Sequence, residues 1–206
     1  MRQYRIGEEA LTDKAVLLGF LYRVGSRNDG VLGDRLKMQK LTFLFCHELF
    51  KQRIKALNYI FFTYRWGPFT KDLYEAEADF EQADLMHREG RVFSLTETGV
   101  KWGQSIYDAL GGDPYNCEIV ETMDAIVDRF SRNSTQTLVD YSRAMNITPI
   151  GWHETEQLDE LPLHLDLTAV VDEEEATAII EIDRGLLDSF AMALAFGARF
   201  QAVPAI

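Results

Sequence analysis

Apolar residues recur at every third or fourth position along most of this chain, a spacing that predicts a mainly helical fold. In residues 11–24, for example, Ala15, Leu18 and Leu21 repeat in this way. A second helix is expected from Asp34, a typical capping residue, to about residue 55. Its apolar positions cover much of its circumference, so it should be the central buried helix. Further helices are predicted over residues 70–86, 97–110, 115–130, 134–145 and 176–200.

Two segments depart from the helical spacing and favour strands. Residues 59–66 are β-branched and aromatic, and Gly67 with Pro68 should end this strand. Residues 87–91 are typical of a turn that leads into a strand over residues 92–95, which predicts a small β-hairpin.

These elements predict a mainly α protein with a small β-hairpin, arranged as a winged-helix-like helical core over residues 1–148. Residues 149–206 form an acidic C-terminal extension. Within it we expect a short strand over residues 165–171 and then the last helix, which is amphipathic.

The acidity of the chain belongs mostly to this extension. The formal net charge is −12, and eleven acids lie between residues 144 and 183, where no Lys or Arg occurs. Such a segment should stay solvated or lie against a basic surface, on a partner or on residues 23–65, which hold nine Lys or Arg against three acids. The apolar face of the last helix, at Leu186, Leu187 and Phe190, argues against simple solvation. Two interpretations stay open: the helix packs on the protein's own core, or it docks on a partner and specifies it.

Three sequence blocks, taken in order, carry a resemblance to a known family. They read KMQKL at residues 37–41, YRWGPFTKDLY at residues 64–74 and FSLTETG at residues 93–99. The chain resembles the Panacea domain family, which includes SocA-like proteolytic adaptors and the antitoxins of toxin–antitoxin pairs, and is also similar to the YwgA-like proteins. The resemblance covers about residues 11–110. It implies a binder that neutralises a toxin or presents a client to a protease, and it implies no cofactor.

The same blocks supply candidate contacts with a partner protein. Lys37 and Lys40 lie three apart on one helix face, where they form either its solvated edge or a partner contact. Aromatic residues gather around the Gly-Pro turn, either packed in the core or exposed as a patch. The candidate partner-binding residues are Lys37, Lys40, Trp66, Phe69, Tyr74, Leu186, Leu187 and Phe190.

A winged-helix outline also suggests a transcription regulator, whose helix before the wing would enter the major groove of DNA. The helix predicted over residues 70–86 opposes this function, because six carboxylates follow Lys71 and would be repelled by phosphates. The basic residues 23–65 and the wing residues Arg88 and Arg91 would have to bind DNA instead. Protein binding is therefore the leading hypothesis, and DNA binding is the alternative.

No motif in the sequence predicts an enzyme. The four histidines lack the spacing of a helical metal site, and Cys46 and His47 are adjacent on a helix, which suits a nucleophile–base pair poorly. Cys46 and Cys117 should be buried, free thiols. The chain shows no export signal and no apolar stretch long enough to span a membrane. We expect a cytoplasmic, non-catalytic protein without a cofactor or a metal.

Overall fold

The computed structural model describes residues 7–149, 152–167 and 176–197, and within them the protein is mainly helical, as the apolar spacing predicted. None of the described helices is long and apolar enough to cross a membrane. The helices are α1 (Gly7–Ser26), α2 (Arg35–Lys51), α3 (Asp72–Gln82), α4 (Glu97–Gly112), α5 (Cys117–Phe130), α6 (Thr135–Arg143) and α7 (Arg184–Phe196), with short 3-10 helices at Pro114–Asn116 and Leu158–Glu160.

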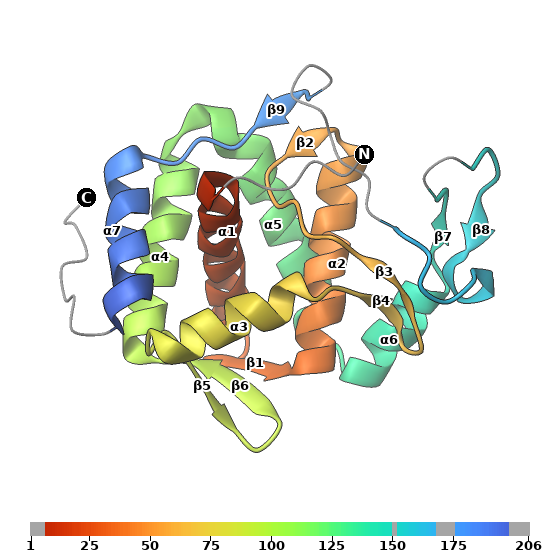
Figure 1. Cartoon of the computed structure of the whole chain (residues 1–206), viewed down its shortest axis with the longest axis horizontal. Helices are drawn as coiled ribbons and strands as arrows, with labels where there is room; N and C mark the ends of the chain where they lie inside the picture. Colours follow the sequence, from red (N-terminus) through yellow and green to blue (C-terminus); the bar gives the residue numbers. More distant parts are fainter. Residues whose placement is uncertain (1–6, 150–151, 168–175, 198–206) are drawn as a thin grey trace.

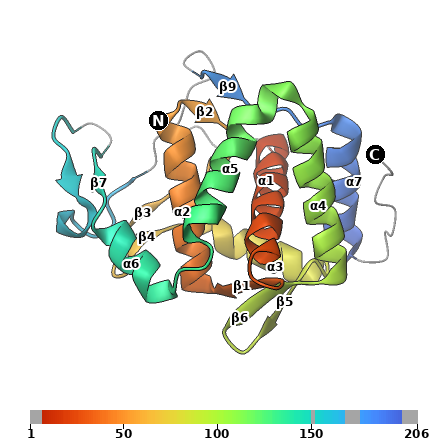
Figure 2. The ribbon, with the colours of Figure 1, turned by 180° about the vertical axis from the view of Figure 1, so that it is seen from behind.

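Helix α1 occupies the middle of the helical body, with α4 on one side and α2 and α5 on the other (Figures 1 and 2). The sequence favoured the second helix for this central place. Helix α2 does bury most of its first half, including Met38, Leu41 and Phe45, but its last two turns expose Phe50 and Lys51. The expected cap of α2 is confirmed, because the side chain of Asp34 accepts a hydrogen bond from the backbone N–H of Lys37.

A three-stranded antiparallel sheet lies at one end of the helical body. It consists of β1 (Val31–Asp34), β6 (Val92–Leu95) and β5 (Met86–Glu89), in that order. Strands β5 and β6 form the hairpin that the sequence predicted, and β1, which was not predicted, pairs with β6. Along the chain, α1, β1 and α2 come first, three short strands between residues 54 and 69 follow, and α3 then leads into the hairpin.

A second hairpin corrects the strand predicted over residues 59–66. Strand β3 (Phe62–Tyr64) is shorter than expected, and Gly67 and Pro68 do not end the β structure but begin β4 (Gly67–Phe69), which pairs with β3. Gly67 has a φ of +86°, a conformation that a residue with a side chain rarely adopts, and it reverses the chain here. Pro68 is tolerated because β3 and β4 form only a two-stranded sheet.

The acidic segment folds over the helical body in short pieces. Strand β7 (Asn146–Ile147) pairs with β8 (Glu156–Gln157), and β9 (Ala178–Ile179) runs parallel to β2 (Ile54–Lys55). Part of the strand expected over residues 165–171 is present as a bridge between Asp166 and Phe62, while residues 168–171 lie outside the described residues. The last helix begins at Arg184 and not at residue 176; its predicted end at residue 200 also lies outside them.

Helix α7 packs on the protein's own core. Leu186, Leu187 and Phe190 are buried, and the Phe190 ring lies 5.7 Å from that of Trp102 on α4. Figure 2 shows α7 alongside α4. The interpretation of these three residues as partner contacts is therefore wrong, because the core already covers the apolar face of α7.

The basic residues between 23 and 65 do not form one surface for the acidic segment. Four of the nine pair with acids from other parts of the fold, and a fifth, Lys51, pairs with Glu48 on its own helix, so the charge of these five is already compensated. These pairs are Arg23–Asp124, Arg27–Asp128, Arg35–Glu77, Lys51–Glu48 and Lys55–Glu9.

Replacing Phe190 by Ala should destabilise the whole protein, because it leaves a cavity beside Trp102. We expect the free energy of unfolding to fall by about 3–5 kcal/mol in urea titrations. Met192→Ala, at an exposed position of the same helix, is the control and should change it by less than about 0.5 kcal/mol. Equal stability of the two variants would show that α7 is dispensable for the fold.

A second prediction concerns Gly99, in the first turn of α4. A Cβ at this position would lie 1.8 Å from the carbonyl oxygen of Leu85, and a backbone atom cannot move aside as a side chain can. Gly99→Ala should lower the free energy of unfolding by at least about 2 kcal/mol. In the same helix, a Cβ added at Gly111 would meet no atom within 4 Å. The melting temperature of the Gly111→Ala variant should therefore be equal to or higher than that of the wild type. A Gly99→Ala variant as stable as the Gly111→Ala control would contradict this packing.

Candidate functional site

Two buried polar side chains of α2 hold the β3–β4 hairpin. Lys40 donates from Nζ to the carbonyl oxygen of Pro68 at 2.7 Å. Gln39 donates from Nε2 to the carbonyl oxygen of Thr70 at 2.8 Å, and its Oε1 accepts the Thr70 N–H at 2.9 Å. Both side chains are almost inaccessible to water. Burying an amide and an amine without hydrogen bonds would cost free energy, and these bonds offset that cost. They connect the first sequence block to the second.

Lys40 lies neither on the solvated edge of α2 nor in a position to contact a partner, so both interpretations of this lysine from the sequence are wrong. Only 1% of it is exposed, because β4 covers this face of α2. Burial lowers the pKa of Lys40 to about 7. Lys37, three residues earlier, is half-buried, and burial lowers its pKa against the opposing effect of Asp34.

The outer edge of the hairpin is held by residues 162–167, which we call the strap. The side-chain oxygen of Thr63 donates to the Pro162 carbonyl and accepts the Leu165 N–H. The backbone of Thr63 is also bonded to the strap on both sides, to Leu165 at 2.9 Å and to His164 at 2.9 Å. Thus the acidic segment supports the hairpin from one side while α2 supports it from the other (Figure 1).

Aromatic rings cover the surface of this hairpin. The Phe69 ring lies 5.1 Å from Phe62, 5.4 Å from Tyr64 and 5.6 Å from Tyr74. The imidazole of His164 extends the row and lies 5.8 Å from Tyr64. The rings therefore form one continuous group, which we call the aromatic row: Phe62, Tyr64, Phe69, Tyr74 and His164.

The aromatic row is open to solvent. Tyr64 is 44% exposed and Tyr74 is 41% exposed, while Phe69 is partly buried between them. Trp66, at the tip of the hairpin, is 53% exposed. Core packing is therefore the wrong interpretation for Tyr64, Trp66 and Tyr74, and the alternative, an exposed aromatic patch, describes them. Sequence could not decide this, because a strand rich in aromatic residues has the same pattern in both settings.

Arg35, the first residue of α2, joins Tyr74 to the core beneath it. Its guanidinium carbon lies 4.2 Å from the centre of the Tyr74 ring and 5.4 Å from that of Phe93. Its Nε donates to Glu77 at 2.5 Å. Glu77 is buried, and burial raises its pKa to about 7 although Arg35 opposes the shift. The contact fixes Tyr74 in place while leaving part of its ring exposed.

Three members of this surface were not identified from the sequence: Arg35, Phe62 and His164. His164 comes from the acidic segment, far along the chain from the hairpin, and no spacing pattern connects the two. Its φ of +66° is unusual for a residue with a side chain. Arg35 follows a capping residue and has no feature that separates it from an ordinary surface arginine.

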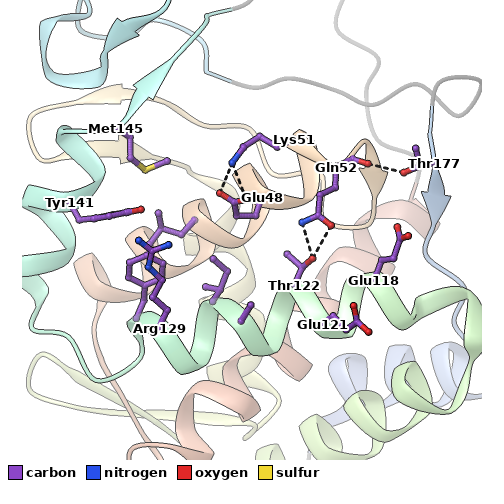
Figure 3. A pocket seen from close by; sticks show the side chains of 14 residues that line it. Glu48, Lys51, Gln52, Glu118, Glu121, Thr122, Arg129, Tyr141, Met145 and Thr177 are labelled. Carbon is purple, nitrogen blue, oxygen red and sulfur yellow. Dashed lines mark hydrogen bonds and ion pairs between the residues drawn. The ribbon is translucent and has the colours of Figure 1, made fainter.

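A larger concave feature lies between α2, α5 and α6, away from the aromatic row. It is a groove of about 820 Å³, and Figure 3 shows Tyr141 of α6 and Met145, which follows α6, at one end and Glu118 and Glu121 of α5 at the other. The side chains of Gln52 and Thr122 are hydrogen-bonded across its floor (Figure 3). A smaller cavity of about 510 Å³ adjoins it and includes His47.

The groove holds charges of both signs. Lys51 is bonded to Glu48 within it, and Arg129 lies against the rings of Phe130 and Tyr141. In the adjoining cavity, burial lowers the pKa of His47, whose ring stacks on Phe43. This arrangement can bind a mixed polar and apolar surface.

The two cysteines lie in different settings. Cys46 is half-buried, and Cys117, at the start of α5, is exposed, so the expectation of two buried thiols is wrong for Cys117. Among the described residues, no three His, Cys, Asp or Glu side chains come together in a group that could hold a metal ion.

The buried Lys40 predicts a characteristic pH dependence of stability. Its native pKa of about 7 lies below its ordinary value of 10.5. Between these values, the unfolded chain binds a proton that the native protein does not bind. Stability should therefore rise with pH across this window, by at most about 1.4 kcal/mol per pH unit.

Lys40→Met should remove most of this rise, as measured by urea unfolding at pH 7 and pH 9.5, and the lowered pKa of Lys37 should account for what is left. Lys51→Met, which removes an exposed lysine, is the control and should keep the rise seen in the wild type. A Lys40→Met variant with the same pH dependence as the wild type would show that Lys40 keeps its proton when the protein folds.

No protein-family model, curated protein or solved structure matches this chain. The three sequence blocks and the geometry of the β3–β4 hairpin are therefore the grounds on which a function is proposed.

Proposed function

We propose that this protein is a non-catalytic protein-binding module, an antitoxin or a proteolytic adaptor, and that the β3–β4 hairpin is its binding surface. The observation that carries the proposal is the aromatic row with Trp66 at its tip. Tyrosine and tryptophan are enriched among the residues that dominate binding energy at protein interfaces. Large aromatic side chains that stay exposed on a firmly held hairpin are typical of such an interface.

The support beneath the hairpin favours the same function. A binding surface that is already ordered loses little conformational entropy when the partner arrives. Here α2 holds the hairpin from within through Gln39 and Lys40, and the strap holds its outer edge through Thr63. The resemblance to the Panacea domain family implies binding of a toxin or a protease client, and two of the blocks that carry it meet at this hairpin.

A winged-helix-like core is part of the proposal. The order α1, β1, α2, α3 and then the β5–β6 hairpin, with β1 paired to β6, supports it, although β2, β3 and β4 are inserted between α2 and α3. In DNA-binding proteins of this type, the helix before the hairpin enters the major groove, and here that helix is α3. Its side chains oppose such a role, because Glu75 and Glu81 are exposed and Asp79 is bonded to Lys14. Protein binding is therefore the better-supported function.

The experiment that tests this function compares two exposed aromatic sites. A partner captured by the wild-type protein from a lysate of the source organism would be identified by mass spectrometry and purified. Its Kd for the double variant Tyr64→Ala, Trp66→Ala should rise at least about 30-fold, the loss typical of central interface residues.

Tyr115→Ala is the control for this experiment. Tyr115 is 72% exposed between α4 and α5, away from the hairpin, and its replacement should leave the Kd unchanged. If the double variant binds as tightly as the wild type, the hairpin is not the binding surface.

A further inference from the structure

A cleft of about 510 Å³ opens directly beside the aromatic row. Strand β3, the start of α3 and the strap enclose it, and these segments lie next to one another in Figure 1. Its lining includes Phe62, Lys71, Asp72, Glu75, His164 and Asp166. Two of these residues, Phe62 and His164, belong to the aromatic row, so the cleft and the proposed binding surface are continuous.

Acidic groups dominate the charge of the cleft. Asp72 and Glu75 come from α3 and Asp166 from the strap, and Lys71 is the one basic residue among the lining side chains of this cleft. The carboxylate of Asp72 is held in place, because its Oδ2 accepts the N–H of Ile60 at 2.7 Å. Carboxylates collected from two segments into one concave site concentrate a negative potential there.

The aromatic side of the cleft suits a planar cation. Two of the lining residues are rings, Phe62 and His164, whose centres lie 6.3 Å apart, and the ring of Tyr64 lies 5.8 Å from the same imidazole. The aromatic row already binds one guanidinium within the protein, because Arg35 lies 4.2 Å from the centre of the Tyr74 ring. Rings of this kind attract a cation through their electron-rich faces.

The groove of Figure 3 differs in this respect. It combines Glu118 and Glu121 with Arg129, so its charges select no single class of partner side chain. The cleft beside the hairpin combines an excess of carboxylates with aromatic rings, and that combination matches one side chain in particular. Arginine is planar, always charged, able to bond a carboxylate through two N–H groups and able to stack on a ring.

We propose that this cleft receives an arginine side chain of the partner protein. The carboxylates of Asp72, Glu75 and Asp166 compensate its charge, and its guanidinium lies against the aromatic row. The apolar residues that flank this arginine in the partner then contact Tyr64 and Trp66. This inference rests on the proposed function and names the chemistry of the partner that the hairpin recognises.

The test uses peptides selected for binding to the full-length protein from a phage-displayed random library. The selected sequences should be enriched in arginine next to apolar residues. For a synthetic selected peptide, exchange of its arginine for neutral citrulline should weaken binding about tenfold or more, as expected for loss of a hydrogen bond between charged groups.

Glu75→Gln should weaken binding of the arginine peptide by a similar factor but should leave binding of the citrulline peptide unchanged, because the two changes remove the same contact. Glu118→Gln, in the groove of Figure 3, is the matched control and should leave both affinities unchanged. Glu75 and Glu118 are both exposed, so neither replacement should impair folding.

Three outcomes would overturn the inference: a library that yields no binding peptide, selected peptides without enrichment in arginine, or an arginine peptide whose affinity does not depend on Glu75. Peptides that lack arginine but lose affinity in the Tyr64→Ala, Trp66→Ala variant would refute the arginine site alone and support the hairpin as a binding surface. Peptides whose affinity depends on neither the cleft nor the hairpin would contradict both.

Discussion

The hydrogen bonds from Gln39 and Lys40 to the backbone of the β3–β4 hairpin are the interaction on which the candidate site depends. A buried amide or amine without a partner is costly, so these side chains favour the one position of the hairpin in which the Pro68 and Thr70 carbonyls meet them. Gly67, with its φ of +86°, makes the chain reversal that brings those carbonyls to α2. Because the hairpin is fixed to the central helices in this way, its aromatic side chains can remain exposed without losing their order.

The acidic segment belongs to the fold and also to the site. Leu158, Leu161 and the buried face of α7 share one hydrophobic core with the preceding helices, while the strap pairs with β3 and brings His164 and Asp166 to the hairpin. Residues 144–183, which carry no positive charge, can lie against the helices in this way because their apolar residues such as Leu158 and Leu161 face inward while many acids stay in water, among them Glu154, Asp159 and Glu160. Two ion pairs join the described part of this segment to preceding helices, Asp159 with Arg143 at the end of α6 and Arg184 with Glu8 of α1.

Charge compensation decides which surfaces are available to a partner. Arg23, Arg27 and Arg35 are engaged with acids of neighbouring helices, so a basic stretch of sequence does not become a basic surface. The cleft beside the hairpin shows the converse, because carboxylates from two distant segments meet there with one lysine. The surface charge of this molecule therefore depends less on the net charge of a stretch of sequence than on which charged groups folding brings together.

From the sequence alone, the periodic apolar residues determined most of the helices, and the cap at Asp34 determined where α2 begins, because these are local effects of spacing and hydrogen bonding. The hairpin of β5 and β6 was predictable for the same reason. Only the tertiary structure decided that Lys40 is buried, that Tyr64, Trp66 and Tyr74 are exposed, and that Phe190 packs against Trp102. A lysine on a helix face, or an aromatic residue in a strand, has the same local pattern whether or not another segment covers it. Which segment covers it is set by contacts between residues far apart in the chain, and the strap shows this most clearly, since nothing near Thr63 in the sequence indicates that residues 162–167 will pair with it.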